Sequence, residues 1–191
     1  MKAFSIWQPW ASLIIAGATP FETRHWSPPE RVVGQQIAIH AAQRCASTDL
    51  IHDLLAAVES GILPRETSSR AIAVLYDALG DGLPTGKILG AARLSAAYKC
   101  GPVITGNQIQ VVRAVTRDDD PVLIPSDPFG NFTAGRWAWL LEDIQPFARP
   151  IPAFGRQGLW DWDRPIDSDA LAHRHTAPGG TRISEGEDRA L

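Results

Sequence analysis

The sequence predicts an α+β fold that is mainly β: a small β-barrel with helices on its outside. Short segments in which apolar and polar residues alternate recur along the chain and dominate it from residue 87 onward. Between the early and the late segments lie two amphipathic stretches that are long enough for helices. Gly and Pro number 16 and 15 among 191 residues, which indicates many turns and argues against a helix bundle.

The N-terminal elements are expected to be a strand, a short helix and a second strand. Residues 2–6 alternate weakly, as a strand does. The apolar positions of 10–16 share one helical face, Pro9 suits the first turn, and Gly17 suits the C-terminal end. A helix of two turns must be held by packing rather than by propensity. Residues 20–25 are expected to be extended.

The middle of the chain predicts one strand and a pair of helices. In 35–40, Ile37 and Ile39 face one way, whereas Ala38 and His40 face the other. Apolar stripes then predict helices at 48–60 and 67–79 and later strands at 87–97, 108–116, 136–144 and in the final "GLWDWD".

Residues 1–164 are expected to be one domain, with the helical pair at about 47–80 as an insertion. The segment 165–191 has low hydrophobicity and mixed charge. We expect it to be a disordered tail, with at most a short helix over 167–173.

Charge and composition exclude several classes of protein. The net charge is −3, whereas a protein that holds long duplex DNA usually has a basic excess. Any nucleic-acid contact must therefore use a local groove or pocket. Two cysteines make neither a disulfide framework nor a zinc knuckle. The N-terminus does not have the pattern of a signal peptide, and no apolar run reaches the ~18–20 residues of a membrane span. We expect a cytoplasmic protein with no metal and no cofactor.

Three separated segments together resemble one family. They are "FSIWQPWASLIIAG…FETRHW", "QIAIHAA" followed by "GKILGAARL", and "GRWAWLLEDIQPFARPIPAFGRQGLW". In this order and spacing they resemble the ASCH domain, the activating signal cointegrator homology domain, across about residues 2–162. The resemblance implies a PUA-like barrel, in which the first helix and the following strand line a cleft.

The opening motif of that family, G-x-K-x-x-E-x-R, is matched here with one departure. The stretch runs from Gly17 to Arg24, and Glu22 and Arg24 match, but Thr19 stands at the lysine position. In ASCH proteins that are amidohydrolases on N4-acetylcytidine, this lysine is part of the catalytic set. Thr19 has no titratable amine, which weighs against that activity.

Glu22 and Arg24 are the central candidates for a site. Two residues apart on a strand, they point to the same face. Arg24 can bind a phosphate or a base edge, and Glu22 can orient it or accept from a cytosine-like amino group. The alternative is a structural ion pair at the mouth of the barrel.

His40 lies between small residues, which suits the wall of a cleft. If it faces Glu22, the two can share a proton, which is the minimum for acid–base chemistry, and they are then the catalytic candidates if the protein is an enzyme. The alternative is a core histidine that is hydrogen-bonded to the backbone.

Aromatic and polar residues around the motif complete the expected site. Trp10 and Trp26 flank it and are the stacking candidates among seven tryptophans, most of which we expect in the core. The other expected nucleic-acid contacts are Gln8, Arg136, Arg156 and Gln157, where solvated loop charges are the alternative for the arginines.

The sequence therefore favours a nucleic-acid-binding ASCH module. Its expected partner is RNA or another single-stranded nucleic acid, or a single nucleotide or nucleoside, bound at the junction of helix and barrel. The alternative is a hydrolase, either a ribonuclease or an amidohydrolase on a modified cytidine. A protein-interaction module would use the helical pair as its docking surface, but few exposed apolar residues are expected there.

Removal of residues 165–191 tests the predicted domain boundary. Because the tail has too few apolar residues to contribute to a core, the shortened chain should keep the melting temperature of the full chain. Thermal unfolding followed by circular dichroism measures this, and a drop of many degrees would contradict the boundary.

Overall fold

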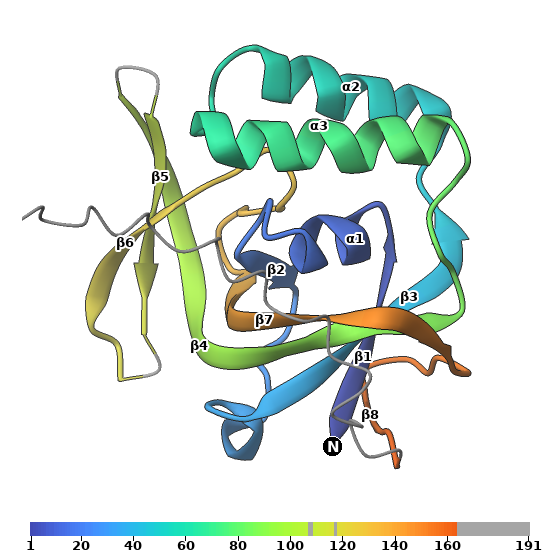
Figure 1. Ribbon diagram of the computed structural model, residues 1–191. Coiled ribbons are helices and arrows are strands. Elements are labelled where there is room, and N and C mark those ends of the chain that lie inside the picture. The colour runs from blue at the N-terminus through green and yellow to red at the C-terminus, as the bar shows by residue number, and fades with distance from the viewer. Residues whose placement is uncertain (107–108, 117, 164–191) are drawn as a thin grey trace, which may run out of the picture.

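The structure is a computed structural model that describes residues 1–106, 109–116 and 118–163. Three α-helices, one 3₁₀ turn and eight strands make up this part of the chain (Figure 1). In chain order the elements are β1 (Lys2–Gln8), α1 (Trp10–Ile15), β2 (Phe21–Arg24), η1 (Glu30–Val32), β3 (Gln36–Cys45), α2 (Thr48–Glu59), α3 (Arg65–Leu79), β4 (Lys87–Gly106), β5 (Ile109–Val115), β6 (Pro121–Pro125), β7 (Trp137–Pro152) and β8 (Leu159–Asp161).

All eight strands belong to one curled sheet. Its main path runs in the order β2-β7-β4-β3-β1-β8, and β5 and β6 continue from the far half of β4. The pairing is antiparallel except between β1 and β3, which are parallel. The curl brings β2, at one end of the path, close to β1 near the other end: Arg24 Nη2 donates to the Ser5 carbonyl across this seam at 3.0 Å.

Helix α1 lies against the concave side of the sheet and links two cores. Ile14 packs into the sheet core with Phe4, Ile39 and Trp139. Leu13 instead packs into a second core between α1 and the helical pair. The helix ends as predicted, because Gly17 adopts φ +68° and donates its N–H to the Ile14 carbonyl.

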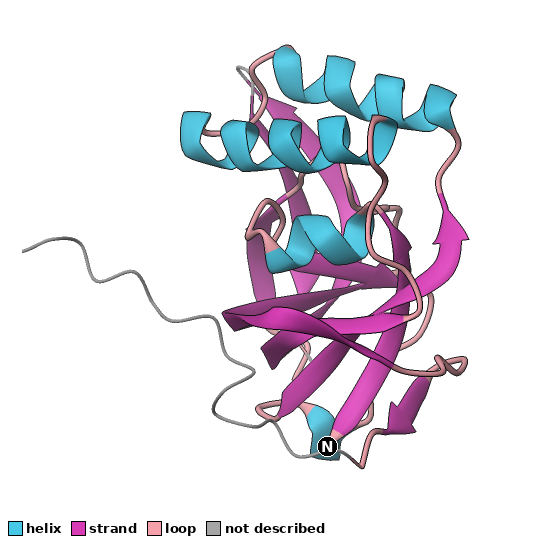
Figure 2. Cartoon of the chain, turned by 45° about the vertical axis from the view of Figure 1, so that its right-hand side comes forward, coloured by secondary structure: helices cyan, strands magenta, loops and turns pink. Residues whose placement is uncertain are grey.

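The two later helices pack against each other and cover α1 (Figure 2). Ser47 caps α2, because its hydroxyl oxygen accepts from the Leu50 N–H at 3.3 Å. The apolar stripes of both helices face the second core, where Leu75 is fully buried. The predicted fold class, mainly β with flanking helices and a helical pair between β3 and β4, is confirmed.

Two features of the sheet depart from the predictions. Strand β6 was not among the predicted strands. In the described part of the chain it pairs with β5 alone, and an edge strand tolerates the prolines that stand at both of its ends. Strands β4 and β7 are longer than predicted. Strand β4 continues past residue 97 by pairing with β5, with a register shift between Cys100 and Val103, and β7 continues past residue 144 by pairing with the start of β4, with a shift between Ile88 and Gly90. The predicted tail, including the helix at 167–173, lies outside the described residues.

None of the helices in residues 1–106, 109–116 and 118–163 has the length and hydropathy that a bilayer span requires.

Leu75→Ala tests whether the helical pair is part of the folding unit. Removing this buried side chain leaves a cavity in the second core, so the free energy of unfolding should fall by about 2–5 kcal/mol. Tyr76→Ala is the matched control. Tyr76 is the next residue along the helix and is 57% exposed, so its replacement should change stability little. Urea unfolding measures both; equal effects would show that the second core does not stabilise the domain.

Candidate functional site

A pocket of about 300 Å³ opens at the seam between β1 and β2. Strand β1 contributes one side, β2 the floor, and a loop that follows β6 the opposite side. Among the described residues, its lining consists of Ser5, Ile6, Trp7, Trp10, Phe21, Glu22, Thr23, Arg24, Phe129, Gly130, Asn131 and Arg136.

An ion pair lies at the floor of the pocket. Arg24 Nε is 2.7 Å from Glu22 Oε1, and the Glu22 side chain is largely buried. The Arg24 Nε–H itself is not aligned with a hydrogen-bond acceptor, although its Nη2 donates to Ser5. The ion pair between Glu22 and Arg24, which the sequence offered as the structural alternative to ligand binding, is present. The pair is both a structural contact across the seam and part of the pocket surface.

The Glu22 carboxylate is held in an unusual electrostatic environment. Burial raises its pKa above the ordinary value of 4.5, and the nearby guanidinium groups of Arg24 and Arg136 oppose that rise. The charged groups that line the pocket are therefore one carboxylate and two guanidiniums, a local positive excess on a chain of net charge −3.

Asp127 shapes the loop that forms the far wall. Its Oδ1 accepts from the N–H groups of Phe129 and Gly130, both at 2.9 Å. Its Oδ2 accepts from the Thr19 hydroxyl at 2.5 Å. Burial raises the pKa of Asp127, and these hydrogen bonds counteract it. Thr19, at the position where the motif has lysine, thus holds a wall of the pocket and is itself buried.

Arg136 fastens the same loop to β2. Its Nε donates to the Asn131 carbonyl at 3.1 Å and its Nη2 to the Thr23 carbonyl at 3.2 Å. Asn131 N–H in turn donates to Thr23 Oγ1 at 2.9 Å. Arg136 therefore borders the pocket as predicted, with two of its donors engaged and its charge retained there.

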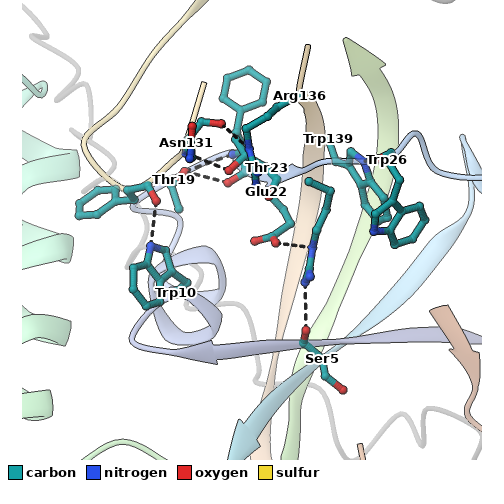
Figure 3. Close-up of polar contacts among 12 residues, drawn as sticks. Ser5, Trp10, Thr19, Glu22, Thr23, Trp26, Asn131, Arg136 and Trp139 are labelled. Atoms are coloured by element: carbon teal, nitrogen blue, oxygen red, sulfur yellow. Dashed lines mark hydrogen bonds and ion pairs between the residues drawn. The ribbon is translucent and has the colours of Figure 1, made fainter. Parts of the chain in front are cut away.

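The aromatic side chains of the pocket differ from those predicted. Trp10 lines the pocket, and its Nε1–H donates to the Phe129 carbonyl at 2.8 Å. Trp26 does not line it: the ring packs edge-on against Trp139 with centroids 4.8 Å apart, as Figure 3 shows. The second tryptophan of the pocket is Trp7, which is 44% exposed.

Gln8 was predicted to contact a ligand but has a structural role. Its side chain is buried, and Nε2 donates to Ser12 Oγ and to the Pro84 carbonyl, both at 2.8 Å. Its Oε1 accepts from the Ser12 N–H at 3.1 Å. Because both amide donors are engaged within the fold, Gln8 anchors the start of α1.

His40 is not the acid–base partner of Glu22 that the sequence suggested for an enzyme. The ring is buried on the opposite side of the sheet from Ile39, where it packs edge-on against Trp160. Its Nε2–H donates to the Ala153 carbonyl at 3.1 Å, and Nδ1 lies 3.1 Å from Ser5 Oγ. Both ring nitrogens thus have partners other than Glu22, and burial lowers the pKa of His40.

Arg156 and Gln157 lie on the loop between β7 and β8, with exposed side chains. Neither lines the pocket, but the Arg156 carbonyl accepts from Ser5 Oγ at 3.0 Å. Their loop therefore borders β1 at the residue that also receives the Arg24 hydrogen bond.

Sequence reasoning missed three parts of this site: Trp7, Asn131 and Asp127. Alternation along β1 placed Trp7 opposite the core residues Phe4 and Ile6, and that signal was available. Nothing local in the loop marked Asn131 or Asp127, because their partners are about a hundred residues away.

No group of three or more His, Cys, Asp or Glu side chains is arranged to hold a metal ion in the part of the chain that the structure describes. Cys45 is exposed and Cys100 is buried, and both are free thiols. The histidines His173 and His175 lie outside this part.

Comparison with known proteins adds a structural likeness. The sequence matches no protein-family model and no curated protein. The structure is similar to the crystal structure of ASCH from Zymomonas mobilis, at 18% identity, with a TM-score of 0.42 and coverage of 85% of this chain and 87% of that one. A mutant of that protein matches at 18% identity, a TM-score of 0.41 and the same coverage.

Both are ASCH structures. They carry the name of the domain that the motifs of this chain resemble. At this identity and TM-score they assign neither a ligand nor a reaction to this chain, so its own residues must supply the functional argument.

The buried His40 predicts a specific dependence of stability on pH. Its folded-state pKa lies below the ordinary 6.5, so the unfolded chain binds the proton first as the pH falls through that value. Stability contributed by neutral His40 is present above pH 6.5 and is lost below it, by at most about 1.4 kcal/mol per pH unit.

His40→Gln should remove this component, since an amide can still donate to the Ala153 carbonyl but does not titrate. Urea unfolding of both proteins between pH 7.5 and 5.5 measures the difference in slope. Parallel curves for the two proteins would contradict the assignment.

Proposed function

We propose that this protein binds single-stranded nucleic acid, RNA in particular, by holding one nucleotide in the pocket at the β1–β2 seam. The observation that carries the proposal is the combination of Trp7 and Trp10 with a floor of one carboxylate and two guanidiniums. Aromatic rings stack on bases of any sequence, and arginines bind phosphates.

The dimensions and charge of the pocket support this. A volume of about 300 Å³ is at the lower end for small-molecule sites and suits one base rather than a duplex. A net charge of −3 does not favour a long electrostatic contact with DNA, whereas two guanidiniums in one pocket favour a local contact with phosphate.

Glu22 suggests which kind of base fits. An ionised carboxylate only accepts hydrogen bonds, and it pairs well with the exocyclic amino group of cytosine. Its raised pKa reflects lost hydration, so an amino group that replaces water there gains a strong partner. We therefore propose a preference for a base that carries an amino group over uracil.

The hydrolase alternative has less support. Thr19 donates to Asp127 and is buried, so it is not placed as a nucleophile toward the pocket. His40 is engaged with Ser5 and Ala153. The pocket retains one acid–base group, Glu22, which is paired with Arg24. These contacts favour binding over turnover of RNA or of a modified nucleoside.

The test is the affinity of the full chain for the labelled octanucleotides C₈ and U₈, measured by fluorescence anisotropy. Trp7→Ala should weaken binding of both about fivefold or more, since stacking on an aromatic ring contributes ~1–3 kcal/mol per base. Trp7 is partly exposed, so this change should leave the fold intact. Tyr76→Ala, on the outside of α3, is the control and should bind as the parent does.

Two further variants separate the contributions of the floor. Glu22→Gln should reduce the preference for C₈ over U₈ about fivefold or more, because the amide can also donate to the uracil carbonyl. Arg24→Ala should weaken binding of C₈ and U₈ equally. It should also reduce the slope of log affinity against log salt concentration by roughly one unit. Thermal melting must show each variant folded. Failure of the parent to bind either octanucleotide would refute the proposed function.

A further inference from the structure

The loop between β7 and β8 presents an aromatic side chain that the fold does not use. Phe154 is 96% exposed, the highest value among the exposed large hydrophobic residues that the structure describes. Its neighbours Arg156 and Gln157 are exposed as well. A single exposed apolar residue is common on a mobile loop, so the question is how firmly this loop is held.

Three contacts hold the loop on the outer face of β1 and β3. Ala153 accepts from His40 Nε2, and the Arg156 carbonyl accepts from Ser5 Oγ. Between them, Gly155 packs directly on the imidazole: a Cβ at this position would lie 2.3 Å from His40 Cε1 and 2.7 Å from Ser5 Oγ. Phe154 is therefore displayed on a fixed backbone.

This loop lies next to the pocket. Ser5 belongs to the pocket lining, and it holds the loop through its hydroxyl and Arg24 through its carbonyl. Trp7 lies two residues after Ser5 on the same face of β1, which is about 7 Å along the strand. The Arg44 guanidinium, from β3, stacks over the Trp7 ring at 3.7 Å.

We propose that this outer face is a second contact area for the same single-stranded nucleic acid. Phe154 stacks on a base that lies outside the pocket, and Arg156 contacts the phosphate between that base and the one in the pocket. The inference rests on the proposed function, because it places the continuation of a strand whose one nucleotide occupies the pocket.

The chemistry of the area favours nucleic acid over an apolar protein partner. Exposed arginines accompany the aromatic rings: Arg156 beside Phe154, and Arg44 on Trp7. Alternating aromatic and guanidinium groups are what a single strand requires, with stacking for bases and charge for phosphates. Asp161 is paired with Lys2 at 2.7 Å, and the exposed Asp163, which lines a hollow together with Phe154, is the carboxylate that opposes a phosphate there.

Binding of ligands of two lengths tests the proposal. The full chain and its variants are titrated with labelled C₈ by anisotropy and with cytidine 5′-monophosphate by calorimetry. Phe154→Ala should weaken C₈ binding about fivefold or more and leave binding of the monophosphate unchanged, because a single nucleotide in the pocket has no second base to stack on Phe154. Phe154→Trp should restore C₈ affinity, and Leu123→Ala, an exposed apolar residue on β6, should not alter it.

The outcome separates this inference from the proposed function. If Trp7→Ala weakens C₈ and Phe154→Ala binds it as the parent does, the pocket binds the nucleic acid and the second contact area is refuted. If the parent does not bind C₈, the proposed function fails, and this inference fails with it. Phe154 is almost fully exposed, so its replacement should not affect folding, and thermal melting verifies this.

Discussion

The hydrogen bond from Arg24 to the Ser5 carbonyl connects β2, at one end of the sheet path, to β1, next to the other end, and the arrangement of the site depends on it. The bond crosses from β2 to β1 at a seam that has no other strand pairing in the described residues. Glu22 balances the charge of Arg24 there, at the cost of its own hydration. A buried charge that loses its partner is strongly destabilising, so neither residue can be changed without affecting the seam.

The same seam creates the pocket. Backbone pairing between β1 and β2 would fill the space that the side chains of Glu22 and Arg24 now border. The far wall is a loop, and it is made rigid by Asp127 and Arg136, which satisfy its backbone groups from both sides. A site whose walls are fixed in this way loses little conformational entropy when a ligand binds.

Ser5 joins the pocket to the outer face of the barrel. Its carbonyl and hydroxyl point in different directions and bond to Arg24 and to the Arg156 carbonyl. His40, which looked like a catalytic base from its small neighbours, instead holds the loop that carries Phe154. A histidine with both ring nitrogens in use is a structural residue, and its lowered pKa keeps it neutral near pH 7.

Local patterns were sufficient where a residue's role depends on its own element. Period-two alternation placed Glu22 beside Arg24 and put His40 opposite Ile39, and both placements hold in the structure. The apolar stripes located the helical pair, because a helix that buries one face has apolar residues at intervals that match its 3.6-residue turn.

By itself, the sequence determined the fold class, the order of the elements except β6, and the shared face of Glu22 and Arg24, because these depend on patterns within single segments of the chain. Only the tertiary structure decided which tryptophans border the pocket. Trp26 was expected in the site because it flanks the motif, but it meets Trp139, more than a hundred residues away, and does not border the pocket. The structural role of Gln8 likewise depends on a distant residue, since its side chain donates to the Pro84 carbonyl. Contacts between distant residues depend on how the sheet curls, and no local repeat encodes that curl.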